Sequence, residues 1–449
     1  MGFPATAVIE VRATGSDTQC GGGFNSARGG TDYSQQNAAQ ATGTVTSATT
    51  TVTATTGIFT AAMVGNYITD GTTYKEITGF TSSLIVTVDS APSWTAATVY
   101  VGGALASPGK ASGIATFGNI VQWKKGTYSA TTTTPNVAGG IVSCPASSFS
   151  ITNAITWIGY NSVRGDNPLA GSGNQPSFEA SGIASVALFT IANVSVNIEN
   201  IQFDGKSLTG MGGVVVSGNR NNARKCTFKN FKNHASDGVN LQECYVTGCA
   251  TTVAVNNFTY IEDCVVTGNV DGVDSEQDGA AIIRCIIASN TGKGVAQGGG
   301  GWGINVQDST IANNTGDGVS NFRAAFSSFR NCIVYGNGGK GLNDNGDNLN
   351  GTLIESCAFG ANTSGNYTAG ARSLNEVTLT GNPFNNAGVG DYSLNANVGA
   401  GGACRAAGIP GVFPGTLTTG YLDIGAAQHQ EAVSGGIIDS PTFTGGFCD

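Results

Sequence analysis

Residues 226–359 repeat one short pattern of polar and hydrophobic positions. Each copy begins with a small residue, here called a rung, and a strand-like segment such as residues 260–263 or 353–356 precedes it. Six rungs are cysteines: Cys226, Cys244, Cys264, Cys285, Cys332 and Cys357. Ser309 is the rung of a further copy, between Cys285 and Cys332. The spacing averages about 22 residues, which is typical of solenoid repeats.

Asparagine and glycine recur at fixed places within the same repeat. An asparagine follows most rungs after five residues, as Asn269, Asn290, Asn314, Asn337 and Asn362, and Cys249 stands at this place in an earlier copy. A glycine comes shortly afterwards, at Gly272, Gly294, Gly318 and Gly341. Both residue types tolerate the left-handed backbone of sharp corners. Each repeat is therefore predicted to bend at these places.

The repeats are too short to contain a crossover helix, so successive strands must stack by winding around one axis. Equivalent residues would then lie about 4.8 Å apart, the distance between neighbouring strands. Cysteines that point inward would form a buried column, because cysteine packs as a small hydrophobic residue. The sequence predicts an all-β protein, a right-handed single-stranded parallel β-helix of about a dozen coils.

The N-terminal part has a different pattern. Residues 8–11 are predicted to form a first strand, whereas residues 43–103 alternate with period two and contain a turn at Asp70-Gly71. Such alternation is typical of antiparallel strands. It predicts a small antiparallel β module inserted near the N-terminus. This module is either a cap that shields the open edge of the first coil or an attachment domain.

Four regions are expected along the chain. An N-terminal strand and capping segment occupies residues 1–42, and the inserted β module residues 43–103. The parallel β-helix follows at residues 104–398, and a C-terminal cap and tail at residues 399–449. Residues 421–425 are predicted to form a closing strand. A solenoid needs such irregular ends to remain soluble.

Composition and charge restrict the partners. Charged residues make up 11% of the chain and the net charge is −9, so a phosphate backbone, which requires clustered basic residues, is not expected as a ligand. The sequence has neither a signal peptide nor an apolar run long enough for a membrane span. The 11 cysteines are expected to be reduced and buried, as in a protein that folds in a reducing cytosol.

Several segments carry a resemblance to a known group of proteins. Residues 121–128, 157–160 and 421–426, together with the repeats, resemble the pectate-lyase-like superfamily of right-handed β-helix proteins. The early β insertion is similar to bacteriophage tail spike and fibre proteins of that superfamily. The superfamily includes lyases, hydrolases and binding spikes, so the resemblance implies the fold and leaves the chemistry open. The characteristic sequence motifs of the polygalacturonases in this superfamily are missing from the chain.

The candidates for catalysis lie in one acidic stretch. Asp274, Glu276 and Asp278 could supply the two carboxyl groups of glycoside cleavage or bind calcium; the alternative is a solvated loop. The two histidines, His234 and His429, are too few for a histidine-based zinc cluster and make a Ser-His-Asp triad improbable.

The binding candidates are separate from the acidic stretch. Trp302, between glycines, is the candidate platform for stacking a sugar ring, and its alternative is packing on another subunit. Asp344 and Asp347 are candidate calcium ligands, although an Asn/Gly corner also explains them. Apart from calcium, no cofactor is expected.

Four charged residues precede the recurring Gly-Val and Gly-Leu pairs: Asp271, Lys293, Asp317 and Lys340. Stacked coils would place them in one column of alternating sign. Opposite charges on neighbouring strands favour the correct register. This column gives Asp271 and Asp317 a structural role, so neither is a candidate catalyst.

The expected function is that of a virion-exposed bacteriophage structural protein, a tail spike, fibre or head spike that binds host cell-surface polysaccharide. It would be made in the host cytoplasm, contact other virion proteins and form a homotrimer, with neither nucleic acid nor membrane as partner. Apolar residues at corners, such as Trp302, Phe322 and Phe326, favour a subunit contact. The alternative is a polysaccharide lyase or glycoside hydrolase.

Overall fold

The computed structural model describes residues 3–116, 118–130, 140–144, 154–182, 187–192, 196–217, 221–275, 277–298, 303–320, 327–344, 351–367, 370–409 and 422–428. They form two compact units. The first comprises Met1–Asp204 with Val214–Cys226, and the second Gly205–Gly213 with Thr227–Asp449.

The first unit contains parallel strands in three sheets. In one sheet, β1 (Val8–Val11) pairs with β9 (Ile120–Lys124), which is followed by β12 (Ile155–Tyr160), β15 (Val196–Glu199) and β18 (Asn221–Arg224). The other sheets contain β10 (Thr127–Ala130), β13 (Ser177–Ala180) and β16 (Gln202–Asp204), and β11 (Gly140–Cys144) with β14 (Ala187–Ala192). The short β2 (Gly23–Phe24) pairs antiparallel with β1. Since β1 pairs directly with β9, the intervening chain is an insertion into the first coil.

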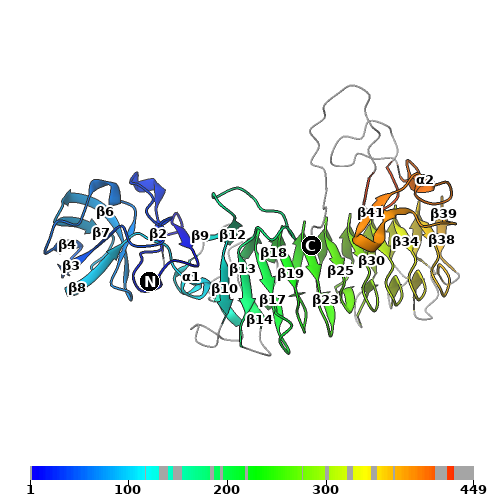
Figure 1. The fold of residues 1–449 in the computed structure, drawn as a ribbon, viewed down its shortest axis with the longest axis horizontal. Helices are drawn as coiled ribbons and strands as arrows, with labels where there is room; N and C mark the ends of the chain where they lie inside the picture. Colours follow the sequence, from blue (N-terminus) through cyan, green and yellow to red (C-terminus); the bar gives the residue numbers. More distant parts are fainter. Residues whose placement is uncertain are drawn as a thin grey trace, which may run out of the picture. The chain divides into compact units, whose positions relative to one another are not determined.

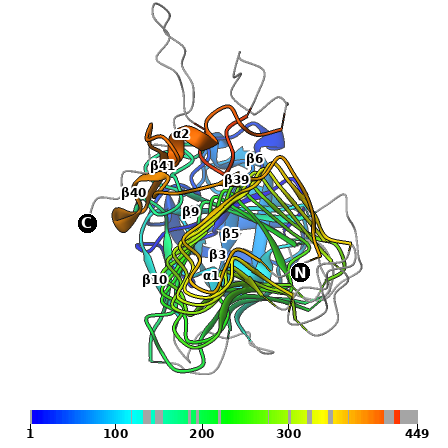
Figure 2. The same ribbon diagram turned by 90° about the vertical axis from the view of Figure 1, so that its right-hand side faces the viewer.

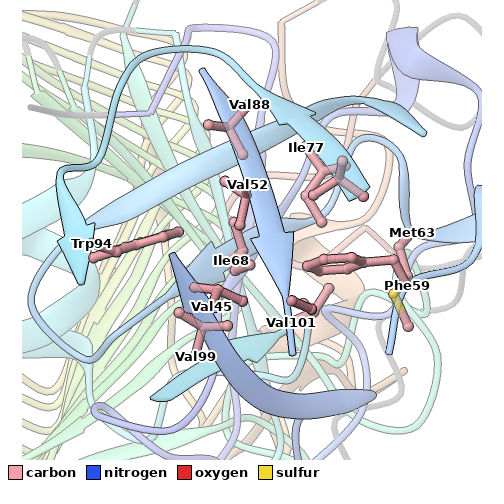
Figure 3. Close-up of a cluster of buried hydrophobic side chains, with 12 residues drawn as sticks. Val45, Val52, Phe59, Met63, Ile68, Ile77, Val88, Trp94, Val99 and Val101 are labelled. Atoms are coloured by element: carbon pink, nitrogen blue, oxygen red, sulfur yellow. The ribbon is translucent and has the colours of Figure 1, made fainter. Parts of the chain in front are cut away.

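This insertion contains a closed antiparallel barrel (Figure 1). Its strands, in spatial order, are β3 (Ala41–Ser47), β4 (Thr51–Ala54), β7 (Ile85–Val88), β6 (Tyr74–Ser82), β5 (Tyr67–Thr69) and β8 (Trp94–Val101). Val52 and Ala54 are buried while Thr51 and Thr53 are exposed. The inward side chains form a compact apolar core around Ile68 (Figure 3). The predicted inserted antiparallel module is thus confirmed.

A short helix after the barrel was not predicted from the sequence. Helix α1 spans Pro108–Ile114, and the Ser107 side chain accepts a hydrogen bond from the Lys110 N–H at its N-terminus. Serine at the N-cap followed by proline is a favourable helix start. The remaining short helical turns are η1 (Ser26–Arg28), η2 (Ala61–Met63) and η3 (Ala387–Val389).

The second unit is built from parallel strands in three sheets. The first sheet contains β21 (Val239–Gln242), β24 (Tyr260–Glu262), β27 (Ala280–Ile283), β30 (Ile304–Gln307), β33 (Ser328–Arg330), β36 (Leu353–Glu355) and β38 (Arg372–Leu374). The second contains β19 (Thr227–Lys229), β22 (Tyr245–Thr247), β25 (Val265–Thr267), β28 (Ile286–Ala288), β31 (Thr310–Ala312), β34 (Ile333–Tyr335), β37 (Ala358–Gly360) and β39 (Val377–Thr378).

The third sheet contains β20 (Ser236–Asp237), β23 (Val253–Asn256), β26 (Asp271–Asp274), β29 (Val295–Ala296), β32 (Val319–Ser320) and β35 (Leu342–Asn343). Strand β17 (Gly212–Ser217) contains residues of both units. One strand of each sheet makes a coil, and the coils lie over one another when viewed along the stack (Figure 2). The predicted parallel β-helix is confirmed.

The rungs point into the interior of the coils, as predicted. The Cys244 N–H donates to Cys264 Sγ at 3.4 Å, and the Cys285 N–H donates to Ser309 Oγ at 3.0 Å. Ser309 therefore continues the column. Nine of the cysteines are buried free thiols: Cys20, Cys226, Cys244, Cys249, Cys264, Cys285, Cys332, Cys357 and Cys404. Burial raises the pKa of Cys264 and Cys285 well above the ordinary value.

The residue before each rung adopts the left-handed conformation even where it is neither glycine nor asparagine. Asp263, Arg284 and Asp308 have φ angles of 52°, 51° and 49°. This conformation turns the chain sharply from the first sheet into the second. The sequence pattern predicted corners at asparagine and glycine, and it missed this corner because charged residues adopt a left-handed backbone rarely.

The C-terminal segment folds back onto the outside of the coils. The hairpin of β40 (Phe384–Asn386) and β41 (Asp391–Leu394) packs with α2 (Gly401–Cys404) on the outer face of the second sheet (Figure 2). Small residues such as Ala288 and Ala312 on that face allow the close contact. The closing strand predicted at residues 421–425 is wrong for the described part, residues 422–425. The N–H groups of Ile424 and Gly425 bind the carbonyls of Cys404 and Asn331 instead.

Candidate functional site

The four alternating charges are stacked as predicted, and the aspartates bind backbone. The Oδ1 of Asp271 accepts the N–H of Lys293, and the Oδ1 of Asp317 accepts that of Lys340, both at 2.7 Å. A Cβ on Gly339 would lie 2.2 Å from the Asp317 carboxylate. Each aspartate therefore stabilises a glycine-containing corner of the next coil through a hydrogen bond to its backbone, which supports a structural role.

The acidic stretch begins on β26 and continues into the turn that follows it. Asp274 is half-buried on β26, and its Oδ1 accepts the Gly298 N–H at 2.7 Å. Asp278 is exposed in the following turn, and Glu276 lies outside the described residues. The catalytic role of the three carboxylates stays a prediction.

The remaining candidates give no metal or stacking site in the part of the chain that is described. Asp344 is buried after β35, whereas Asp347, Trp302 and His429 lie outside the described residues, as do Phe322 and Phe326. His234 is half-buried at a corner, with Nδ1 2.9 Å from the Val253 carbonyl. Within the described ranges, no three His, Cys, Asp or Glu side chains form a cluster that could hold a metal ion.

A buried polar cluster in the first unit is structural. The Glu10 carboxylate is fully buried and accepts hydrogen bonds from Arg12 Nε at 2.8 Å, from Arg164 Nη2 at 2.7 Å and from the Tyr160 hydroxyl. Arg164 also reaches Asp32 of the inserted segment at 2.8 Å. These groups satisfy one another, as buried charges must, and the cluster joins the insertion to the coils of its own unit.

Polar side chains lie on the outer face of the first sheet in the second unit, on both sides of β27, whose outward residues Ala281 and Ile283 are apolar. We call these polar side chains the polar face, and it comprises Asn240, Gln242, Tyr260, Glu262, Asn305, Gln307, Ser328, Arg330 and Glu355, with Asp263 and Arg284 at the adjoining corner. Strand pairing places Gln242 beside Glu262, Gln307 beside Arg330, and Arg330 beside Glu355. Between these residues, Ile261 and its equivalents point inward and are fully buried.

Glu262 lies at the centre of the first half of the polar face. Its Oε2 accepts hydrogen bonds from Gln242 Nε2 at 3.0 Å and from the Tyr260 hydroxyl, and its Oε1 pairs with Arg284. Arg284 also binds both carboxylate oxygens of Asp263, at 2.8 and 2.9 Å. The five residues form one hydrogen-bonded group across three coils, so their side chains are held in place.

The second half of the polar face is more exposed. Arg330 Nε pairs with Glu355 Oε2 at 3.1 Å. The Ser328 hydroxyl donates to Asn305 Oδ1 at 2.8 Å, and Gln307 Nε2 donates to Asp308 at 2.9 Å. Asn305, Gln307 and Arg330 are exposed to solvent. This half therefore presents amide and guanidinium groups to solvent.

The ionisation of these groups favours binding over acid–base catalysis. Burial tends to raise the pKa of Glu262, but hydrogen bonds from Tyr260 and Arg284 outweigh it, so the pKa lies below the ordinary value. Burial, together with the hydrogen bond to Glu262, raises the pKa of Tyr260. Glu262 is therefore a poor proton donor and Tyr260 a poor base at neutral pH, since a catalytic group needs a pKa near the working pH.

The polar face was not identified from the sequence, although a signal for it exists. Its acidic and basic members stand one or two residues before the rungs, for example Glu262 and Asp263 before Cys264 and Arg330 before Cys332. If the residues that precede successive rungs are aligned by repeat, the alignment predicts that their side chains lie next to one another on neighbouring coils. The pattern of the rungs alone does not show that residues before them point outward.

Comparison with known proteins supports the fold. The family described as right handed beta helix region matches residues 251–400. A search of curated proteins finds no match. The stacked coils form a right-handed parallel β-helix.

Solved structures with similarity to the chain include enzymes and phage proteins. The pectate lyase Pel9A has 14% identity and a TM-score of 0.44, over 74% of this chain and 92% of its own. ORF18 of Geobacillus virus E2 has 13% identity and a TM-score of 0.32, over 58% and 52%. Tailspike protein 3 of bacteriophage CBA120 has 10% identity and a TM-score of 0.31, over 57% and 56%. A shared fold does not determine chemistry, which depends on the side chains.

Proposed function

We propose that the polar face binds a cell-surface polysaccharide and that the protein is a virion-exposed bacteriophage structural protein. The observation that carries the binding proposal is the stacking of hydrogen-bonding side chains in two groups, Gln242 with Glu262 before β27 and Gln307 with Arg330 and Glu355 after it. A polysaccharide repeats its hydroxyl groups along its length. Within each group, a glycan lying along the coils would meet a similar side chain at the strand spacing of about 4.8 Å, and between the groups it would cross the apolar Ala281 and Ile283.

The side chains of the polar face suit sugar recognition. Carboxylate and amide oxygens accept hydrogen bonds from hydroxyl groups, and amide and guanidinium N–H groups donate to them. Because Tyr260, Glu262 and Arg284 already hold one another, little conformational freedom would be lost on binding, which favours affinity. The proposed binding requires no cofactor.

The virion assignment is supported by the thiols. Nine buried free cysteines fit a protein that folds in a reducing compartment, as a phage protein does in the host cytoplasm. Among the described residues, no helix combines the length and apolar character needed to cross a membrane. We propose a homotrimer, since several weak glycan sites on one particle raise avidity. Light scattering on the purified chain would measure the mass, and a stable monomer would contradict the trimer.

The glycan proposal is tested by a matched pair of glutamine variants. Gln307 is exposed on the polar face, and Gln277 is exposed in the turn that contains the acidic stretch. We expect Gln307→Ala to weaken binding to immobilised host-surface polysaccharide about threefold to tenfold, the loss of one hydrogen-bonding group, and Gln277→Ala to leave it unchanged. Weaker binding by Gln277→Ala alone would move the site to the acidic stretch.

A further inference from the structure

The arginines of the polar face are engaged with carboxylates of the protein. Arg284 binds both oxygens of Asp263, at 2.8 and 2.9 Å, and also reaches Glu262. Arg330 pairs with Glu355 at 3.1 Å. Because the charge of each guanidinium group is already balanced by at least one neighbouring carboxylate, its attraction for an acidic ligand is reduced.

The charges of the polar face also favour one class of glycan. Its three carboxylates, on Glu262, Asp263 and Glu355, exceed its two guanidinium groups, so its net charge is −1. The low pKa of Glu262 keeps that carboxylate ionised at neutral pH. A polysaccharide with carboxylates on each repeat would be repelled, whereas neutral hydroxyl groups can donate to the same oxygens.

We propose that the polar face selects neutral, hydroxyl-rich glycans and discriminates against polyuronates and sialylated chains. This selectivity rests on the proposed glycan binding at the same face. It comes from repulsion as well as attraction, because the carboxylates that accept sugar hydroxyls also disfavour acidic sugars. Binding of a neutral glycan involves no charge on the ligand, so it should change little with ionic strength.

A glycan array with neutral, uronate-containing and sialylated members tests the selectivity directly. We expect neutral glycans to dominate among those bound, with the same ranking at low and at high salt. Acidic glycans at the top of the ranking would overturn the selectivity and leave glycan binding in place. Binding to no member of the array would overturn the glycan-binding proposal itself.

A charge variant tests the cause of the selectivity. Glu355→Gln releases Arg330 from its ion pair, so we expect retention on immobilised polygalacturonate to rise about threefold to tenfold at low salt and to disappear at high salt. Asp391→Asn makes the same change in net charge on the C-terminal hairpin, where Asp391 binds Ser393, and should give no rise. Equal retention by both variants would mean that net charge, and not the polar face, controls binding.

Discussion

The side-chain oxygen of Asn290 accepts two hydrogen bonds from Asn269, one from the backbone N–H at 3.0 Å and one from Nδ2 at 3.1 Å. The same pair of bonds joins Asn290 to Asn314 and Asn314 to Asn337, in the buried interior. Cys249 begins the column, since its N–H donates to Asn269. The backbone N–H of each asparagine finds this acceptor only when its neighbour occupies the equivalent place, so the column favours one register of the coils.

Replacing Asn290 with alanine should destabilise the protein strongly. The substitution leaves the buried backbone N–H of Asn269 without its acceptor, which costs about 1–3 kcal/mol, and it also removes the bond from Asn269 Nδ2, which keeps the carbonyls of Val246 and Thr267. We expect the free energy of unfolding to fall by about 3 kcal/mol, measured by urea denaturation. Asn305→Ala, at an exposed position of the first sheet, is the control and should change it by less than about 0.5 kcal/mol. Equal effects would contradict a special role of the buried column.

The cysteine column predicts a characteristic pattern of thiol labelling. Nine of the thiols are buried and free, and burial raises the pKa of Cys264 and Cys285, which lowers the reactive thiolate fraction. We expect a thiol reagent to modify few cysteines of the native protein and nearly all 11 after denaturation without reductant. Mass spectrometry would count the labels. Several cysteines that resist labelling in denaturant would reveal disulfides and remove the support for folding in a reducing compartment.

Reversing one charge in the alternating column should disturb the stacked corners. In Lys293→Asp, a new carboxylate would lie between Asp271, which already accepts the N–H of residue 293, and Asp317 in the next coil. Like charges on neighbouring strands repel, so we expect a loss of about 1 kcal/mol and a lower melting temperature. Lys293→Ala, which keeps the backbone bond to Asp271, should lose less. An unchanged melting temperature in Lys293→Asp would exclude electrostatic coupling between the corners.

Glu262 should make stability depend on pH in the acidic range. Its pKa in the folded protein lies below the ordinary value of 4.5, since hydrogen bonds from Tyr260 and Arg284 outweigh the effect of burial. A lowered pKa stabilises the folded state fully above pH 4.5, and this contribution is lost as the pH falls through the folded-state value. Glu262→Gln should therefore be less stable than the parent at pH 7, with a smaller difference at pH 3. A constant difference between these pH values would show that Glu262 does not titrate with folding.

The repeat could be read from the sequence because it is a local pattern. The rungs Cys244 to Cys357, the asparagines that follow them and the period of about 22 residues each specify one coil. The antiparallel strands of the barrel could be predicted in the same way, since buried and exposed residues alternate along strands such as Thr51–Ala54. Both features depend on the preference of a side chain for the interior or the surface at a regular interval, which a single strand already displays.

The tertiary structure decided which outward side chains meet. Glu262 and Arg284 are 22 residues apart and belong to different coils, and their contact depends on the lateral register and on the left-handed corners at Asp263 and Arg284. The path of the C-terminal segment depended on contacts in the same way, because the Gly425 N–H binds the Asn331 carbonyl and not a strand edge. Local preferences do not specify such contacts between distant residues, since many pairings would satisfy the same pattern. The β-helix fold could therefore be predicted from the sequence. The polar face could be identified only from the structure, because it depends on how the coils stack.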